Sequence, residues 1–169
     1  MQMLETVLSR RSIRAYTDEP VPRETIEGLL AAAMGAPSAA DEEPWQFIVI
    51  DDPHILENLP SVHPFTPGSG HAPAAVLICG DLSLLRTPGF WVQDCSAATE
   101  SLLLAAHAMG LGAVWTAVFP LEDRMLGFRI LFSLPDHIIP FALVPIGHPA
   151  EEPPTADRFR KERIHYNGW

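Results

Sequence analysis

Basic residues are scarce in this chain. Its 169 residues include 11 lysines and arginines against 21 aspartates and glutamates, which gives a formal net charge of −10 at pH 7. A nucleic-acid-binding protein needs a broad basic face that neutralises phosphates. The composition therefore excludes nucleic acid as a general partner, although it leaves room for one local basic pocket.

Long hydrophobic runs and cysteines are also few. No apolar stretch approaches the roughly 20 residues of a membrane span, and the N-terminus lacks the positive flank and apolar block of a signal peptide. We therefore expect a cytoplasmic protein with no membrane partner. The two cysteines, Cys79 and Cys95, lie in apolar segments, which favours reduced core thiols over a disulfide.

Sequence motifs for several common chemistries are absent as well. The chain has no GxxxxGK[ST] phosphate loop, no GxSxG nucleophile motif and no HExxH metal motif. The Gly68-Ser69-Gly70 stretch lies in a proline-rich segment with no strand before it, which is the wrong context for a dinucleotide-binding fold. We expect no metal and no protein-borne nucleophile, so a cofactor would carry the reaction of any enzyme built on this chain.

The composition and periodicity predict one packed domain over residues 1–169, because 47% of the chain is hydrophobic and 19% charged. The hydrophobic periodicity and the turn residues predict helices over 3–8, 22–35, 53–59, 91–109 and 120–132, and strands over 46–50, 74–79, 113–118 and 141–146. The helix over 91–109 is apolar all round in its second half, which predicts burial. The fold class is α+β, with a central sheet flanked by helices on both faces.

Arginine is concentrated near the N-terminus of the chain. Arg10, Arg11 and Arg14 fall within five positions at the end of the first predicted helix, with Ser12 between them. Guanidinium groups and a hydroxyl supply donors that match phosphate oxygens. The alternative is a solvated helix end whose arginines pair with surface carboxylates.

The C-terminal tail, residues 151–169, is the second polar concentration. It holds four of the 11 basic residues and finishes with Tyr166 and Trp169. The tail is too polar to pack alone, yet it ends in aromatic anchors. A tail with aromatic anchors usually lies across a surface, often that of a partner subunit, and we expect the same here.

Three stretches, in this order, resemble the nitroreductase family of FMN-dependent oxidoreductases. They read RRSIRAYTDEPVP at 10–22, APSAADEEPWQFIVI at 36–50 and SAATESLLLAAHAMGLGAVWTAVFP at 96–120, and the ending RFRKERIHYNGW at 158–169 is similar to that of the smaller members. The resemblance implies a nitroreductase-like fold with a central mixed sheet and an obligate homodimer with a domain-swapped C-terminal tail. It also implies two FMN molecules at the subunit interface.

The resemblance further implies which residues hold FMN. Four match the segment at the flavin phosphate, ribityl chain and pyrimidine ring: Arg10, Arg11, Ser12 and Arg14. Four match a loop that reaches over from the other subunit: Pro37, Ser38, Ala39 and Asp41. Three match the strand end whose backbone N–H groups approach N5 and O4 of the flavin, namely Thr116, Ala117 and Val118, and Arg158 matches a basic residue returning from the tail to the phosphate.

Two acidic residues depart from the family pattern, which usually has Asn at Asp41 and often Gln at Glu43. A carboxylate cannot donate the hydrogen bonds of an amide, and it disfavours an electron-rich reduced flavin. Residues 61–72 are expected to form a loop over the substrate side. His63 and His71 either line that side or, as the favoured interpretation, are exposed.

The resemblance implies a ping-pong enzyme. NAD(P)H gives a hydride to flavin N5 and leaves, and a planar acceptor such as a nitroaromatic or a quinone then takes its place and is reduced. Two alternatives stay open. One is a family member with another substrate, such as an enone or flavin itself, and the other is a non-catalytic flavin-binding module, which Asp41 and Glu43 suggest.

Overall fold

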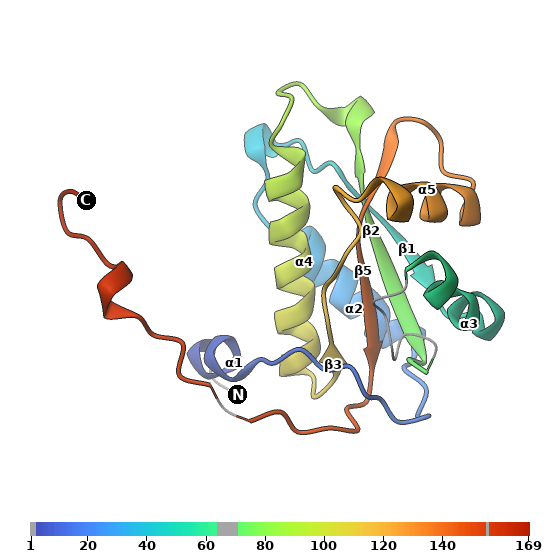
Figure 1. Cartoon of the computed structure of the whole chain (residues 1–169), viewed down its shortest axis with the longest axis horizontal. Helices are drawn as coiled ribbons and strands as arrows, with labels where there is room; N and C mark the ends of the chain where they lie inside the picture. The colour runs from blue at the N-terminus through green and yellow to red at the C-terminus, as the bar shows by residue number, and fades with distance from the viewer. Residues whose placement is uncertain (1–2, 64–70, 155) are drawn as a thin grey trace.

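The computed structural model describes residues 3–63, 71–154 and 156–169 (Figure 1). Its helices are α1 Met3–Ser9, α2 Arg23–Met34, α3 Pro53–Val62, α4 Trp91–Ala108 and α5 Glu122–Leu131. Its strands are β1 Trp45–Ile50, β2 Ala74–Asp81, β3 Gly112–Ala113, β4 Thr116–Ala117 and β5 Ile138–Gly147, with short 3-10 helices at Ala39–Asp41, Leu82–Leu84 and Lys161–Arg163. The α+β class is confirmed.

The strands form one sheet in the order β1-β2-β5-β3, with β4 also paired to β5. The sheet was expected to be mixed, but every pairing between described strands is antiparallel. The connection that follows β1 shows the physical reason. Ile50 at the end of β1 pairs with Ala75 near the start of β2, so α3 is inserted at one end of the sheet and does not carry the chain across it.

The strand predicted over residues 113–118 is interrupted in the structure. Ala113 pairs with Ile146 in β3 and Thr116 pairs with Leu143 in β4, three residues further along both partners. The register with β5 therefore continues through a break at residues 114–115. Because of this break, residues 114–115 next to β4 are not part of the regular hydrogen-bonded ladder with β5.

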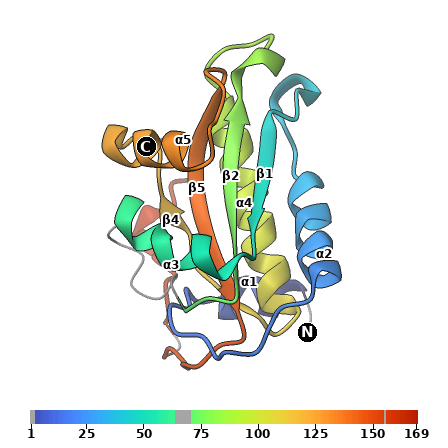
Figure 2. The ribbon, with the colours of Figure 1, turned by 90° about the vertical axis from the view of Figure 1, so that its right-hand side faces the viewer.

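Strand β2 carries both halves of the core, since all eight of its residues are buried. Val76 and Ile78 pack in the cluster that includes α2 and α4, whereas Leu77 and Cys79 pack in the cluster that includes α3 and α5. Figure 2 shows the sheet between these two helical layers. A strand buried on both faces is expected to be largely apolar, and β2 is apolar from Ala74 to Gly80.

The long helix α4 is buried along one side, whereas burial all round its second half was predicted; Leu104 and Ala105 on the other side are only partly buried in the single chain. Ala98, Leu102 and Ala106 have no exposed surface, and they pack against α2 and the sheet. Cys95 on the same helix and Cys79 on β2 are both free and buried, and burial raises the pKa of each thiol to about 12. None of the described helices has the length and apolar character that crossing a bilayer requires.

The tail leaves the body of the molecule as an extended arm (Figure 1). Its described residues from 157 to the end are all exposed, including the fully exposed Trp169. Helix α1, beside the start of the arm, also exposes apolar side chains such as Met3 and Leu4. Within one chain, these apolar groups are left in contact with water.

Candidate functional site

The segment that carries the arginines is fixed to the sheet by Ile13. The Ile13 N–H donates to the Ala113 carbonyl at 3.1 Å, and its side chain lies over Gly112. A Cβ at Gly112 would lie 2.6 Å from Ile13 Cγ2, so only glycine permits this contact. The buried Tyr16 hydroxyl donates to the Ile13 carbonyl at 2.6 Å, which fixes the turn that follows.

Arg10 and Arg11 are partly engaged by groups of the chain itself. Arg10 Nε lies 3.3 Å from Glu100 Oε1 on α4. The Arg11 guanidinium donates to four main-chain carbonyls, two local and two in the tail; they belong to Leu8, Arg10, Pro154 and Ala156. Arg11 thus ties the start of the tail to the end of α1.

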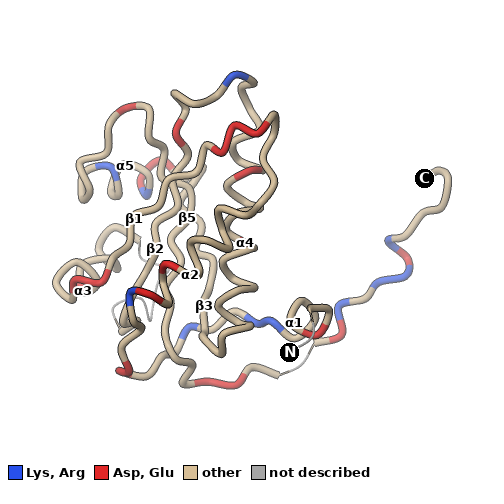
Figure 3. Tube along the Cα trace, turned by 180° about the vertical axis from the view of Figure 1, so that it is seen from behind, with Lys and Arg blue, Asp and Glu red and all other residues tan. Residues whose placement is uncertain are grey.

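Arg158 reaches the same place from the other end of the chain. Together with Arg10 and Arg11 it lines an open hollow of about 680 Å³ between α1 and the tail. Figure 3 shows basic residues of both segments on this side of the molecule. The structure therefore brings together three of the predicted phosphate-binding residues from positions nearly 150 residues apart in sequence.

Arg14 is held through its backbone. Its N–H and that of Ala15, the latter at 3.0 Å, both donate to Glu151 Oε1. These bonds, the one from Arg14 first, lower the pKa of the Glu151 carboxyl. Sequence reasoning missed Glu151, because nothing in its neighbourhood shows that residues 14 and 151 lie side by side.

Strand β4 presents one backbone N–H to the outside. Residues of an antiparallel strand alternate between those that exchange bonds with the partner strand and those whose N–H and C=O point away. Val118 N–H donates to the Phe141 carbonyl of β5 at 3.1 Å, so the backbone of Ala117 faces away from β5. No described strand pairs with that edge. Of the predicted trio, Ala117 is thus the residue placed to donate to a ligand.

The Ala117 carbonyl accepts two bonds, from Arg124 Nη1 of α5 at 2.6 Å and from His63 Nε2 at 2.9 Å. His63 is fully buried at the end of α3, so the favoured prediction of an exposed loop histidine is wrong. Helix α3 runs on to Val62 and turns the ring inward against Phe128. Burial lowers the pKa of His63 most. The nearby positive charge of Arg124 lowers it further. His71 is exposed, and residues 64–70 of the expected loop lie outside the described residues.

The loop of residues 38–43 has an unusual backbone. Ala40, Asp41 and Glu43 have φ values of 52°, 55° and 45°, in the left-handed region. This region is unfavourable for residues that carry a side chain. The loop therefore depends on its surroundings for its shape.

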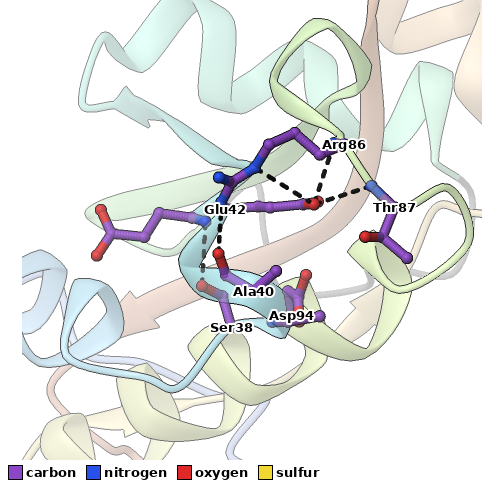
Figure 4. A network of polar contacts seen from close by, with 8 residues as sticks. Ser38, Ala40, Glu42, Arg86, Thr87 and Asp94 are labelled. Carbon is purple, nitrogen blue, oxygen red and sulfur yellow. Dashed lines mark hydrogen bonds and ion pairs between the residues drawn. The ribbon is translucent and has the colours of Figure 1, made fainter.

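Glu42 supplies much of that support from inside (Figure 4). Its side chain is fully buried, and Oε1 accepts the N–H groups of Arg86 at 3.0 Å and Thr87 at 2.9 Å. The Arg86 guanidinium in turn donates to the Ala40 carbonyl. Asp41 and Glu43, by contrast, are exposed. The sequence drew attention to these two carboxylates and gave no signal for the buried one between them.

Within one chain the loop and the arginine segment attach to different levels of α4. Ala39 N–H donates to Asp94 Oδ1 at 2.9 Å, whereas Arg10 pairs with Glu100. Six helical residues separate these anchors, which is about 9 Å of rise. The structure therefore does not bring Pro37, Ser38, Ala39 and Asp41 to the hollow of their own chain.

The sequence profile of the nitroreductase family matches residues 7–62 and 70–148 of this chain. The chain belongs to the nitroreductase family. A relative from Methanothermobacter thermautotrophicus, provisionally named NADH dehydrogenase/NAD(P)H nitroreductase, is 54% identical over 169 residues, which cover 100% of this chain and 88% of the relative.

Solved nitroreductase structures have the same fold. A protein of Parabacteroides distasonis with the same provisional name has a TM-score of 0.95 at 43% identity, with 100% of this chain and 99% of the other covered. A provisionally named nitroreductase of Desulfovibrio desulfuricans, solved in complex with FMN, has a TM-score of 0.86 at 30% identity, with coverages of 100% and 98%. The expected nitroreductase-like fold is confirmed.

Proposed function

We propose that this nitroreductase-family protein is an FMN-dependent oxidoreductase that takes a hydride from NAD(P)H and passes it to a planar acceptor, a nitroaromatic or a quinone. The observation that carries the proposal is the convergence of Arg10 and Arg11 with Arg158 on one hollow. This gives an acidic protein a local basic pocket. A structural relative is solved with FMN, whose phosphate is the kind of anion such a pocket suits.

The side chains present fit that group. Arg10, Arg11 and Arg158 all line the hollow and bring three guanidinium groups to it. Hydrogen bonds to charged groups contribute about 1.5–3 kcal/mol each. Two or three of them are enough to retain a phosphorylated flavin despite the net charge of −10.

Bound FMN would supply the atom that accepts and then donates the hydride, with NAD(P)H leaving as NAD(P)⁺ before the acceptor enters. In this ping-pong scheme the residues of the chain orient and stabilise. Arg10, Arg11 and Arg158 bind the phosphate, Arg14 stabilises negative charge at the pyrimidine end, and Ala117 N–H donates at the opposite edge of the ring. No side chain is needed for the hydride transfer itself.

We further propose a homodimer with FMN at the interface. The apolar side chains exposed on α1 and the aromatic ones on the tail, Phe159, Tyr166 and Trp169, gain a burial site only in a larger assembly. In a dimer, the loop of residues 37–41 could reach the pocket of the partner, which explains why it lies apart from the pocket of its own chain. The small-molecule acceptor would then bind between the subunits.

Anaerobic stopped-flow mixing tests the proposed reaction. We expect NADH or NADPH to bleach the flavin of the purified protein, and a quinone mixed in afterwards to restore the oxidised spectrum. If the flavin stays oxidised with both NADH and NADPH, the proposed reaction is contradicted and the non-catalytic flavin-binding module is favoured. Consumption of the flavin itself would favour the flavin-destroying alternative.

A further inference from the structure

Arg124 is not among the residues that the sequence patterns single out. It lies in the first turn of α5, and its Nη1 donates to the Ala117 carbonyl at 2.6 Å. The same Nη1 lies 3.4 Å from His63 Nε2, which also bonds to that carbonyl. Segments α3, β4 and α5 are thus joined at a single oxygen atom.

This oxygen lies on the same side as the N–H that β4 presents to the outside. The N–H and C=O of Ala117 both point away from β5, because Val118 is bonded to β5 and neighbouring residues alternate. In an extended residue these two groups are adjacent. A ligand atom that accepts from Ala117 N–H would therefore lie close to the Arg124 guanidinium.

The charge at this point is positive at every relevant pH. An arginine stays protonated, and burial lowers the pKa of the neighbouring His63 ring. The acidic groups nearest in the same helical turn are Glu122 and Asp123, which line an exposed hollow together with Arg124. They are exposed, so water screens them more than it screens the half-buried Arg124.

We infer that Arg124 is a positioning residue that orients the Ala117 backbone and makes the pocket at its N–H favour the reduced, more negative form of the flavin. The inference rests on the proposed function. It adds a specific source of redox tuning on the side of the ring opposite Arg14. Asp41 and Glu43 act in the other direction if the partner's loop brings them to the ring, so Arg124 offsets them.

The test compares the midpoint potential of bound FMN in the wild type, Arg124→Gln and Arg124→Lys, with Arg129→Gln on the same helix as the matched control. Arg129 pairs with Asp136 and has no bond to β4. We expect Arg124→Gln to reduce the preference for reduced over oxidised FMN about tenfold, which is a fall of about 30 mV for a two-electron couple. Arg124→Lys should retain most of the preference, and Arg129→Gln should match the wild type.

Two results would overturn the inference: an unchanged potential in Arg124→Gln, or equal falls in the glutamine and lysine variants. If Arg124→Gln does not fold, Arg124→Met is the second neutral variant, with the same expected fall. The Kd for oxidised FMN, from flavin fluorescence, is measured in parallel and should change less than threefold in every variant. Failure of the wild type to bind FMN would contradict the proposed function, which separates that failure from failure of this inference.

Discussion

The two regions matched to FMN binding are built in different ways. The loop of residues 38–43 is held by buried groups of its own chain, with Glu42 accepting two backbone N–H groups and Asp94 a third. The segment of Arg10 to Arg14 is held through its backbone and through Ile13, and its first two arginines border an open hollow, where Arg10 also pairs with Glu100 and Arg11 donates to main-chain carbonyls. The loop is supported from inside by buried acceptors, whereas the arginine segment borders an open hollow. The difference suggests that the loop positions the flavin and that the arginines retain it.

The largest expected effect comes from removing the retaining charges. Arg10→Ala combined with Arg14→Ala should weaken FMN binding at least 100-fold, since two charge-assisted bonds of about 1.5–3 kcal/mol each are lost. Titration of FMN fluorescence measures the Kd. The control is Arg160→Ala, because that guanidinium bonds only to carbonyls of its own tail segment among the described residues. Stoichiometric FMN in the double variant would show that the pocket lies elsewhere.

The buried Glu42 side chain, which supports the loop, should contribute mainly to the stability of the fold. Glu42→Ala leaves the N–H groups of Arg86 and Thr87 without their acceptor, and we expect it to lower the free energy of unfolding by about 2–4 kcal/mol. Urea denaturation measures the loss. Glu43→Ala, one residue away and exposed, should change stability by less than about 0.5 kcal/mol. Equal losses in the two variants would contradict the distinction drawn between the regions.

The contact that fixes the arginine segment to the sheet can be tested at Gly112. Gly112→Ala places a Cβ 2.6 Å from Ile13 Cγ2, and overpacking of this kind costs about 1–3 kcal/mol. The thermal unfolding midpoint should fall. Gly168→Ala is the control, since a Cβ there meets nothing within 4 Å. A variant as stable as the wild type would mean that Ile13 can move aside freely.

The smallest expected effect is the pH dependence of Glu151. Its pKa is lowered in the folded protein by the Arg14 and Ala15 N–H groups, so its contribution to stability is present above the unfolded pKa and is lost as pH falls through the folded value. Carboxyl NMR should show Glu151 titrating below the usual range of a glutamate. The stability difference between the wild type and Glu151→Gln should shrink as the pH is lowered through this range. Titration of Glu151 in the usual range of a glutamate would show that the two backbone bonds do not persist in solution.

Much of the fold follows from local patterns in the sequence. The buried α4, the apolar β2 and the boundaries near Pro22 and Gly35 follow from side-chain periodicity and from residues that stop helices, and these are properties of neighbours in sequence. The pairing of strands is not such a property. The antiparallel sheet and the break at residues 114–115 depend on where β5 lies, and no local pattern encodes that position.

The site shows the same division. Arginine clustering is visible in the sequence, and in the structure Arg158 lines the same hollow as Arg10 and Arg11. Glu42, Glu151, His63 and Arg124 were missed or misjudged, because each acts on the backbone of a distant segment. A bond from a side chain to a distant carbonyl or N–H requires no particular residue at the partner position, so the sequence carries no paired signal for it.

In the proposed function, arginines from both ends of the chain hold FMN where two copies of the protein meet. Light scattering and flavin content, measured on one purified sample, test it most directly. We expect a particle of twice the chain mass of 18.6 kDa with one FMN for each chain. A colourless monomer that does not take up added FMN would contradict it.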